Sequence, residues 1–216
     1  LYTRTKDESQ AAYQAADTIQ EIMHRYYPEN SYLVGGTPST RDIQEVITKD
    51  YDLVNLLSNI GVFLVVLLTY RSLVVPIVVM IPIEVAIIFN MAVPYLAGDQ
   101  VVFMGYVIVS CIQLGATVDY SILTTSNYIQ ARKSKNRKEA AWEAMALSIP
   151  AILTSGSILT IVGYVLYAVS SISAIGDLGL LIGRGAFISM ILVMALLPAF
   201  LARVDPLLTK NELQRF

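Results

Sequence analysis

Cysteine and histidine are nearly absent from this sequence of 216 residues, which contains only Cys111 and His24. A single cysteine excludes an internal disulfide, and the two residues together do not supply the spacing of a zinc site. His24 lies in a polar stretch, where a solvated surface position is the simplest interpretation. No nucleophile with a neighbouring base can be identified. We therefore expect no metal site, no cofactor and no enzymatic activity.

Charged residues are also scarce. They make up 15% of the chain against 55% hydrophobic residues, and the mean hydropathy is +0.59. A soluble domain of this length does not normally contain several apolar runs that can each cross about 30 Å of hydrocarbon. This chain contains five, at residues 53–70, 73–96, 101–129, 147–168 and 172–203. The sequence therefore predicts a polytopic α-helical membrane protein with five transmembrane helices.

Basic residues are missing from two of the short connections between these runs. AGDQ (97–100) and VSSIS (169–173) contain no Lys or Arg, whereas Arg71, the loop 131–146 and the C-terminal tail are basic. Cytoplasmic loops of membrane proteins are enriched in Lys and Arg. We therefore expect a multi-pass protein of the cell membrane, in which the loop 131–146 and the C-terminus are cytoplasmic and residues 1–52 are extracytosolic.

The basic loop 131–146 has further interpretations. On its own, RKSKNRK resembles a nucleic-acid patch, but inside-positive anchoring beside a membrane span explains it better, and no nucleic-acid partner is expected. Between Asn136 and Met145, Trp142 and the alanines alternate with charged residues. This pattern is typical either of an interfacial amphipathic helix on the inner leaflet or of a solvated helical linker.

The first 52 residues are more polar than the rest. We expect a strand at LYTRT (1–5), a helix from Asp7 to Tyr27, a strand at SYLVGG (31–36) and a helix from Arg41 towards Tyr51 with Ser39 or Thr40 as its cap. This alternation favours part of a small α/β lobe. The predicted organisation is an extracytosolic α/β lobe at 1–52, a transmembrane bundle at 53–204 and a cytoplasmic tail at 205–216.

Asp119 is the most informative residue, because it lies inside the third apolar run. An acid at the centre of a span costs about 2.5–3.5 kcal/mol by insertion scales, and such residues typically mark proton-handling or ion-handling sites. Gly115 lies one helical turn away on the same face, where a small residue allows a neighbouring helix to approach. Tyr120 follows Asp119 and supplies a phenol that can relay a proton. The alternative is a static hydrogen bond between helices or an ion pair with Arg184.

Two other ionisable residues lie at membrane depth. Glu84 in the second run is either a packed neutral acid or a relay group, and Arg184 in the fifth is either a counter-ion for Asp119 or a structural partner of Asp177. Gly179 and Gly183 precede Arg184 with GxxxG spacing, which favours close helix packing in a membrane. A phosphate-binding loop is excluded because no GK[ST] follows these glycines.

GATVDY (115–120) and LGLLIGRG (178–185) resemble motifs of the RND superfamily of transporters, especially its MMPL family, and so does the order of a lobe followed by five spans. The resemblance implies that this chain is one half of a transporter and contains the end of a porter lobe; the basic loop and tail are typical of the C-terminal half, and the N-terminal half is the alternative. It also implies that Asp119 and Tyr120 match the family's Asp–Tyr pair of proton translocation, and that Gly115 to Asp119 matches its GxxxD motif. Patched and Dispatched relatives share that motif.

The function implied by this resemblance is export of lipids or other hydrophobic or amphiphilic compounds, driven by the proton motive force. The expected partners are membrane lipids, a lipid or hydrophobic substrate, protons, and the other transporter half or a second subunit. Two alternatives stay open: a SecDF-like accessory of protein export, and a sterol-sensing or Patched-like membrane protein without transport activity.

Overall fold

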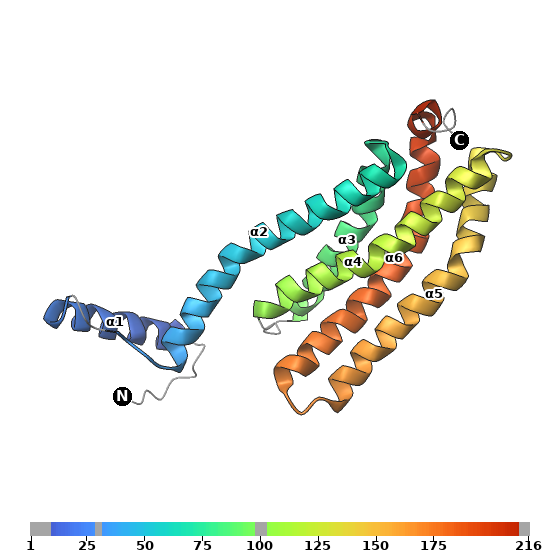
Figure 1. Cartoon of the computed structure of the whole chain (residues 1–216). Helices are drawn as coiled ribbons and strands as arrows, with labels where there is room; N and C mark the ends of the chain where they lie inside the picture. The colour runs from blue at the N-terminus through green and yellow to red at the C-terminus, as the bar shows by residue number, and fades with distance from the viewer. Residues whose placement is uncertain (1–9, 29–31, 98–102, 212–216) are drawn as a thin grey trace. The chain divides into compact units, whose positions relative to one another are not determined.

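The computed structural model describes residues 10–28, 32–97 and 103–211, and every regular element in these ranges is an α-helix (Figure 1). Contacts divide the chain into two compact units, residues 1–53 and 54–216. The helices are α1 (Gln10–Tyr26), α2 (Gly36–Tyr70), α3 (Val74–Ala97), α4 (Phe103–Arg132), α5 (Arg137–Val169) and α6 (Ser173–Asn211).

The first unit contains α1 and the beginning of α2. α1 confirms the predicted helix from Asp7 to Tyr27 over its described residues, and His24 is exposed on it. The prediction of an α/β lobe is wrong for the described residues, because 32–35 form no strand and α2 begins at Gly36. The strand predicted at 1–5 lies outside the described residues.

α2 begins directly after residues 32–35, which form no regular element. Pro38 falls in the first turn, where the fixed φ of proline suits a helix and its missing N–H is not needed. The Ser39 N–H donates to the carbonyl of Gly35 over 3.1 Å and so closes that turn. A strand needs paired neighbours for stability, and the described residues of this unit supply none.

α2 joins two elements that the sequence analysis separates. The predicted helix 41–51 and the predicted span 53–70 are parts of one helix. No Pro or Gly lies between Ser39 and Ile60 to end it. The helix ends at Tyr70, and Arg71 takes a left-handed φ of 51° before α3 begins at Val74.

Within the described residues, five helices are long and apolar enough to cross a membrane, as predicted: the part of α2 from Asp50, α3, α4 from Val107, α5, and α6 as far as Leu207. Residues 137–145, which the sequence predicts as an interfacial helix or a helical linker, form the first turns of α5 and are therefore continuous with the fourth span. Asn136 caps that helix by accepting the N–H of Glu139 over 3.0 Å. Because of this cap, α5 begins at Arg137, and residues 133–136 form the short connection between α4 and α5.

α5 and α6 approach each other through glycines. A Cβ added to Gly163 would lie 2.4 Å from the nitrogen and 2.5 Å from the Cα of Gly183, and 2.7 Å from the carbonyl oxygen of Gly179. These neighbours are backbone atoms of the facing helix, so a side chain at Gly163 would push the two helices apart. Small residues permit such close contact between membrane helices.

Replacing Gly163 with Ala is therefore expected to destabilise the protein by about 1–3 kcal/mol, the usual cost of overpacking a closely packed site. The matched control is Gly61→Ala on α2, where an added Cβ meets nothing within 4 Å and Ala gains about 1 kcal/mol of helix propensity. Thermal unfolding of the full-length protein in detergent measures both. Equal melting temperatures for the two variants would contradict this packing.

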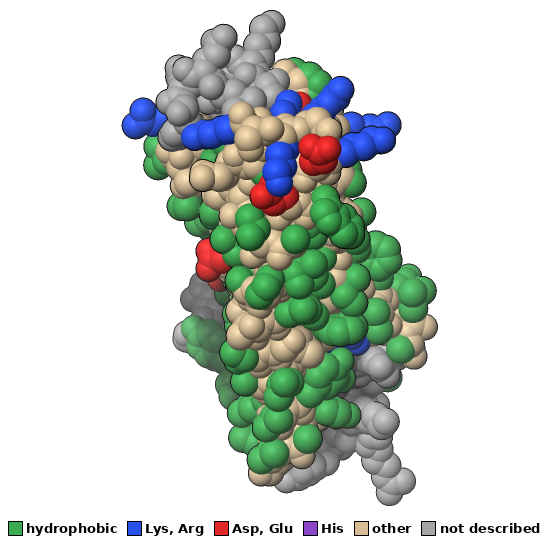
Figure 2. Space-filling model, turned by 90° about the vertical axis from the view of Figure 1, so that its right-hand side faces the viewer, with side chains coloured by type: hydrophobic (Ala, Val, Ile, Leu, Met, Phe, Trp, Pro, Cys, Tyr) green, Lys and Arg blue, Asp and Glu red, His purple; other side chains and the backbone are tan. Residues whose placement is uncertain are grey.

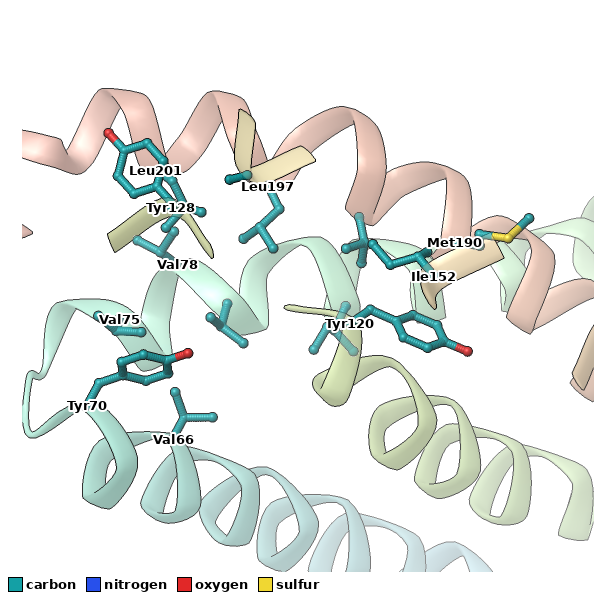
Figure 3. Close-up of a cluster of buried hydrophobic side chains, with 14 of the residues drawn as sticks. Val66, Tyr70, Val75, Val78, Tyr120, Tyr128, Ile152, Met190, Leu197 and Leu201 are labelled. Carbon is teal, nitrogen blue, oxygen red and sulfur yellow. The ribbon is translucent and has the colours of Figure 1, made fainter. Parts of the chain in front are cut away.

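The core of the second unit lies between α2, α3, α4, α5 and α6 (Figure 3). Its buried side chains include the labelled set Val66, Tyr70, Val75, Val78, Tyr120, Tyr128, Ile152, Met190, Leu197 and Leu201. The Tyr70 hydroxyl lies 2.8 Å from the carbonyl oxygen of Ile122, to which it donates, and so attaches α2 to the middle of α4.

The surface of this unit separates apolar from charged side chains. Figure 2 shows Lys and Arg side chains gathered at one end, above a broad apolar surface. α5 contributes exposed apolar residues to that surface, including Ile158, Ile161, Val165 and Val169. A continuous apolar surface beneath a charged rim is what a helix bundle needs in contact with lipid.

Candidate functional site

α4 has two faces of different character. One face is exposed and includes Ile108, Ile112, Gly115 and Asp119, at intervals of three and four residues. The other is buried and polar, with the side chains of Ser110, Gln113, Thr117, Ser121, Thr124 and Thr125 inside the bundle. Residues at such intervals share one face of a helix. α4 therefore directs a polar stripe inward and a carboxylate outward.

Asp119 is exposed, and among the described residues no hydrogen bond or ion pair involves its side chain. The ion pair with Arg184, one of the alternatives from the sequence, is thus absent from the described part of the chain. An added Cβ at Gly115 meets nothing within 4 Å, so no helix of the described chain packs there. An uncompensated carboxylate facing hydrocarbon is costly.

Tyr120 points away from that face. Its side chain is only 8% exposed and belongs to the buried core together with Ile152 and Met190. Consecutive residues on a helix lie about 100° apart. The structure therefore places the two members of the predicted Asp–Tyr pair on different sides of α4, one outside the bundle and one inside it.

A small cavity adjoins Tyr120. Its volume is about 10 Å³, and the polar part of its lining comes from Gln113, Thr117 and Tyr120 of α4. α5 and α6 close it with Leu159, Ile182 and Ala186. This volume is at the lower limit of the room that one water molecule needs. The inner side of the Asp–Tyr pair is therefore tightly packed.

Arg184 belongs to a buried network that joins α3, α4 and α6. Its Nε donates to Asn90 Oδ1 over 2.9 Å, and its terminal nitrogen donates to the backbone carbonyl of Asn90 over 3.0 Å. Asn90 Nδ2 donates to Gln113 Oε1 and to the Leu181 carbonyl, each over 3.0 Å. Gln113 Nε2 donates to Ser189 Oγ over 2.8 Å. We call Arg184, Asn90, Gln113 and Ser189 the polar network.

Gly185 makes room for the polar network. A Cβ at this position would lie 2.5 Å from Asn90 Nδ2 and 2.6 Å from Gln113 Oε1. Any larger residue would displace the two amides from each other. Buried polar groups that lose a partner cost free energy of about 1–3 kcal/mol each, which explains why glycine suits this position.

Glu84 lies on α3, six residues before Asn90. Its side chain is half-buried, and its Oε1 atom is buried without a hydrogen-bond partner among the described residues. No hydrogen bond or ion pair there connects it to Asp119 or Arg184. The structure does not bring the three ionisable residues of the spans together, and the roles expected for them stay predictions.

A buried acid lies at the basic end of the bundle. Asp205 on α6 is 3% exposed. Its carboxylate accepts hydrogen bonds from the Tyr128 hydroxyl over 2.8 Å, from Arg132 Nε over 2.6 Å and from Arg132 Nη2 over 3.0 Å. Arg132 also donates to the carbonyl of Lys135 in the connection between α4 and α5. This cluster fastens α4, α6 and that connection together. No group of three or more side chains suited to hold a metal occurs among the described residues.

These features define a polytopic α-helical membrane protein with an intramembrane acid on an open helix face and a polar network behind it. The chain belongs to the MMPL family, whose model matches residues 1–210. This places it in the family that the motifs of α4 and α6 predict.

Curated relatives agree with this family. ActII-3 of Streptomyces coelicolor, named as a membrane protein, is 26% identical over 206 residues, which cover 91% of this chain and 28% of that protein. MmpL12 of Mycobacterium tuberculosis, named as a probable transport protein, is 22% identical over 197 residues, or 90% of this chain and 17% of that protein. MJ1562 of Methanocaldococcus jannaschii is 20% identical over 203 residues, which cover 93% of this chain and 52% of that protein. The chain thus spans only part of each relative.

Proposed function

We propose that this chain is one half of a transporter that uses the proton motive force to export lipids or other hydrophobic or amphiphilic compounds. The observation that carries the proposal is the exposed carboxylate of Asp119 on a membrane-spanning helix. Ionisable residues inside membranes typically serve proton or ion pathways. The family, and the relative named as a probable transport protein, support transport as the activity.

The open face of α4 indicates where the partner binds. Ile108, Ile112, Gly115 and Asp119 are exposed at intervals of three and four residues, the spacing of a helix–helix seam. A helix from the other transporter half, or from a second subunit, would bury these residues and shield the carboxylate from lipid. Gly115 would allow that helix to approach closely. Protonation of Asp119 would then change the contact between the halves.

The charge distribution supports an orientation. Basic side chains gather at the end of the bundle that holds the α4–α5 connection (Figure 2). With that end in the cytoplasm, as the positive-inside bias favours, residues 1–52 are extracytosolic. Protons entering from outside would then drive export when they leave Asp119 towards the cytoplasm.

The test is transport by the full-length protein in proteoliposomes with an imposed pH gradient. A fluorescent phospholipid is expected to move faster with the gradient than without it, and a protonophore is expected to abolish the difference. Movement of an unfolded polypeptide under the same gradient, with no lipid movement, would favour a SecDF-like role. No gradient-dependent movement of either probe would favour a sensing protein and contradict the proposal.

A further inference from the structure

Gln113 of the polar network lines the same small cavity as Tyr120 of the Asp119–Tyr120 pair. We propose that this network positions the pair, with Gln113 as the positioning residue that fixes how α4 is turned about its axis. The inference rests on the proposed function, because it assigns a role in proton handling to residues that do not themselves exchange the proton.

Both ends of the Gln113 side chain are held. Its Oε1 accepts a hydrogen bond from Asn90 Nδ2 of α3 over 3.0 Å, and its Nε2 donates one to Ser189 Oγ of α6 over 2.8 Å. The side chain is buried, so water cannot replace either partner. A side-chain amide bonded at both ends to two different helices leaves α4 little freedom to rotate. Breaking either bond leaves a buried polar atom unpaired, which is costly.

The rotation of α4 determines what Asp119 faces. Gln113 and Asp119 are separated by six residues, which is about 240° around a helix axis. Holding Gln113 inward therefore holds Asp119 outward, on the same exposed face as Gly115. The same rotation keeps Tyr120 in the core, where its ring and the Gln113 side chain line one cavity of about 10 Å³. A turn of α4 would alter both members of the pair.

Arg184 supplies the charged end of the network. Its guanidinium is bonded to the side chain and the backbone of Asn90, so it fixes the amide that in turn holds Gln113. The acidic side chains of the helices packed around α4 are Glu84 on α3, Glu139 and Glu143 on α5, and Asp177 and Asp205 on α6. Charged donors form stronger hydrogen bonds than neutral ones. The chain of contacts from Arg184 through Asn90 to Gln113 is therefore anchored at its far end.

The test compares Gln113→Leu with Gln130→Leu in the full-length protein. Both changes replace an amide by an apolar side chain of similar size on α4, but Gln130 is exposed and lies outside the network. The readout is the rate at which dicyclohexylcarbodiimide, a reagent for protonated carboxyl groups in apolar surroundings, modifies Asp119. Mass spectrometry of the Asp119 peptide over a series of pH values gives that rate, and gradient-driven movement of a fluorescent phospholipid is measured in parallel.

Gln113→Leu is expected to shift the pH profile of Asp119 modification and to slow transport about 2- to 10-fold, the effect of losing one or two buried hydrogen bonds. Gln130→Leu is expected to match the wild type in both measurements. Should Gln113→Leu fail to fold, Ser189→Ala removes only the bond to Gln113 Nε2 and is expected to shift the profile in the same direction by a smaller amount.

A folded Gln113→Leu or Ser189→Ala protein with the wild-type pH profile would overturn the inference, because a merely structural network does not alter the protonation of Asp119. A different result is expected if the proposed function itself is wrong. In that case the wild-type protein itself shows no gradient-driven movement and no pH-dependent modification of Asp119.

Discussion

Asp119→Asn is expected to reduce gradient-driven transport by the full-length protein to the rate of protein-free vesicles. Asparagine has nearly the same shape as aspartate but cannot take up or release a proton. Because the Asp119 side chain is exposed and makes no hydrogen bond or ion pair within the described part of the chain, the substitution breaks no polar contact there. The melting temperature should therefore stay at the wild-type value while transport is lost.

The matched control is Asp177→Asn, the same chemical change near the beginning of α6. Asp177 accepts a weak hydrogen bond from Ser173 over 3.5 Å and lies outside the site. It should leave transport near the wild-type rate. Gradient-driven movement of a fluorescent phospholipid measures both variants. Transport by Asp119→Asn at the rate of Asp177→Asn would show that the carboxyl group of Asp119 does not couple protons to movement.

Asp205→Ala is expected to have the largest effect on stability, a loss of about 3–5 kcal/mol, as found when one partner of a buried ion pair is removed. Asp205 is 3% exposed and accepts three hydrogen bonds from Tyr128 and Arg132. Without the carboxylate, the guanidinium of Arg132 loses its anionic partner and keeps only the carbonyl of Lys135, and the buried Tyr128 hydroxyl loses its acceptor. The α4–α6 attachment at the basic end is lost with them.

The control for this prediction is Glu139→Ala, which removes an exposed acid from the first turn of α5. Its favourable interaction with the helix N-terminus is worth about 0.3–1 kcal/mol. Denaturant-induced unfolding of the full-length protein in mixed detergent micelles gives the change in the free energy of unfolding for both variants. If the two substitutions lower the free energy of unfolding by the same amount, the hydrogen bonds of Asp205 do not stabilise the contact between α4 and α6.

The spans could be predicted from sequence because each depends on a local property, the length of an apolar run. The predicted start of the fourth span at Leu147 was ten residues late, since the charged residues after Asn136 belong to the same helix. The strand predicted at 31–36 failed for a related reason. Tyr32 to Val34 have strand-forming side chains, but Pro38 and the turn at Gly35 begin a helix directly after them.

The site could be predicted only in part. Asp119 and Arg184 are conspicuous because each is a charge inside an apolar run. Asn90 and Gln113 were not identified as site residues, since a neutral amide in a span is unremarkable until its partner is known. Their contacts join residues 23 and 94 positions apart in the chain. Such pairings depend on how α3, α4 and α6 pack, which hydropathy does not reveal. Asp205 was missed because it was assigned to the tail.

Gly185 gives the clearest example of this limit. The sequence presents it as one more small residue beside Gly179 and Gly183, where close helix packing is the natural interpretation. The structure assigns Gly179 and Gly183 to the contact with α5, but places Gly185 against the amides of Asn90 and Gln113. Neighbouring glycines in one motif thus serve two different purposes, and only the arrangement of the helices separates them.

The central claim is that Asp119 takes up and releases a proton while it lies within the membrane. Modification of Asp119 by dicyclohexylcarbodiimide in the wild-type protein, measured by mass spectrometry as the pH is varied, tests this claim most directly. We expect Asp119 to be modified increasingly as the pH falls, and the reaction to be absent in Asp119→Asn. Lack of modification at every pH, or a rate that does not change with pH, would contradict the account.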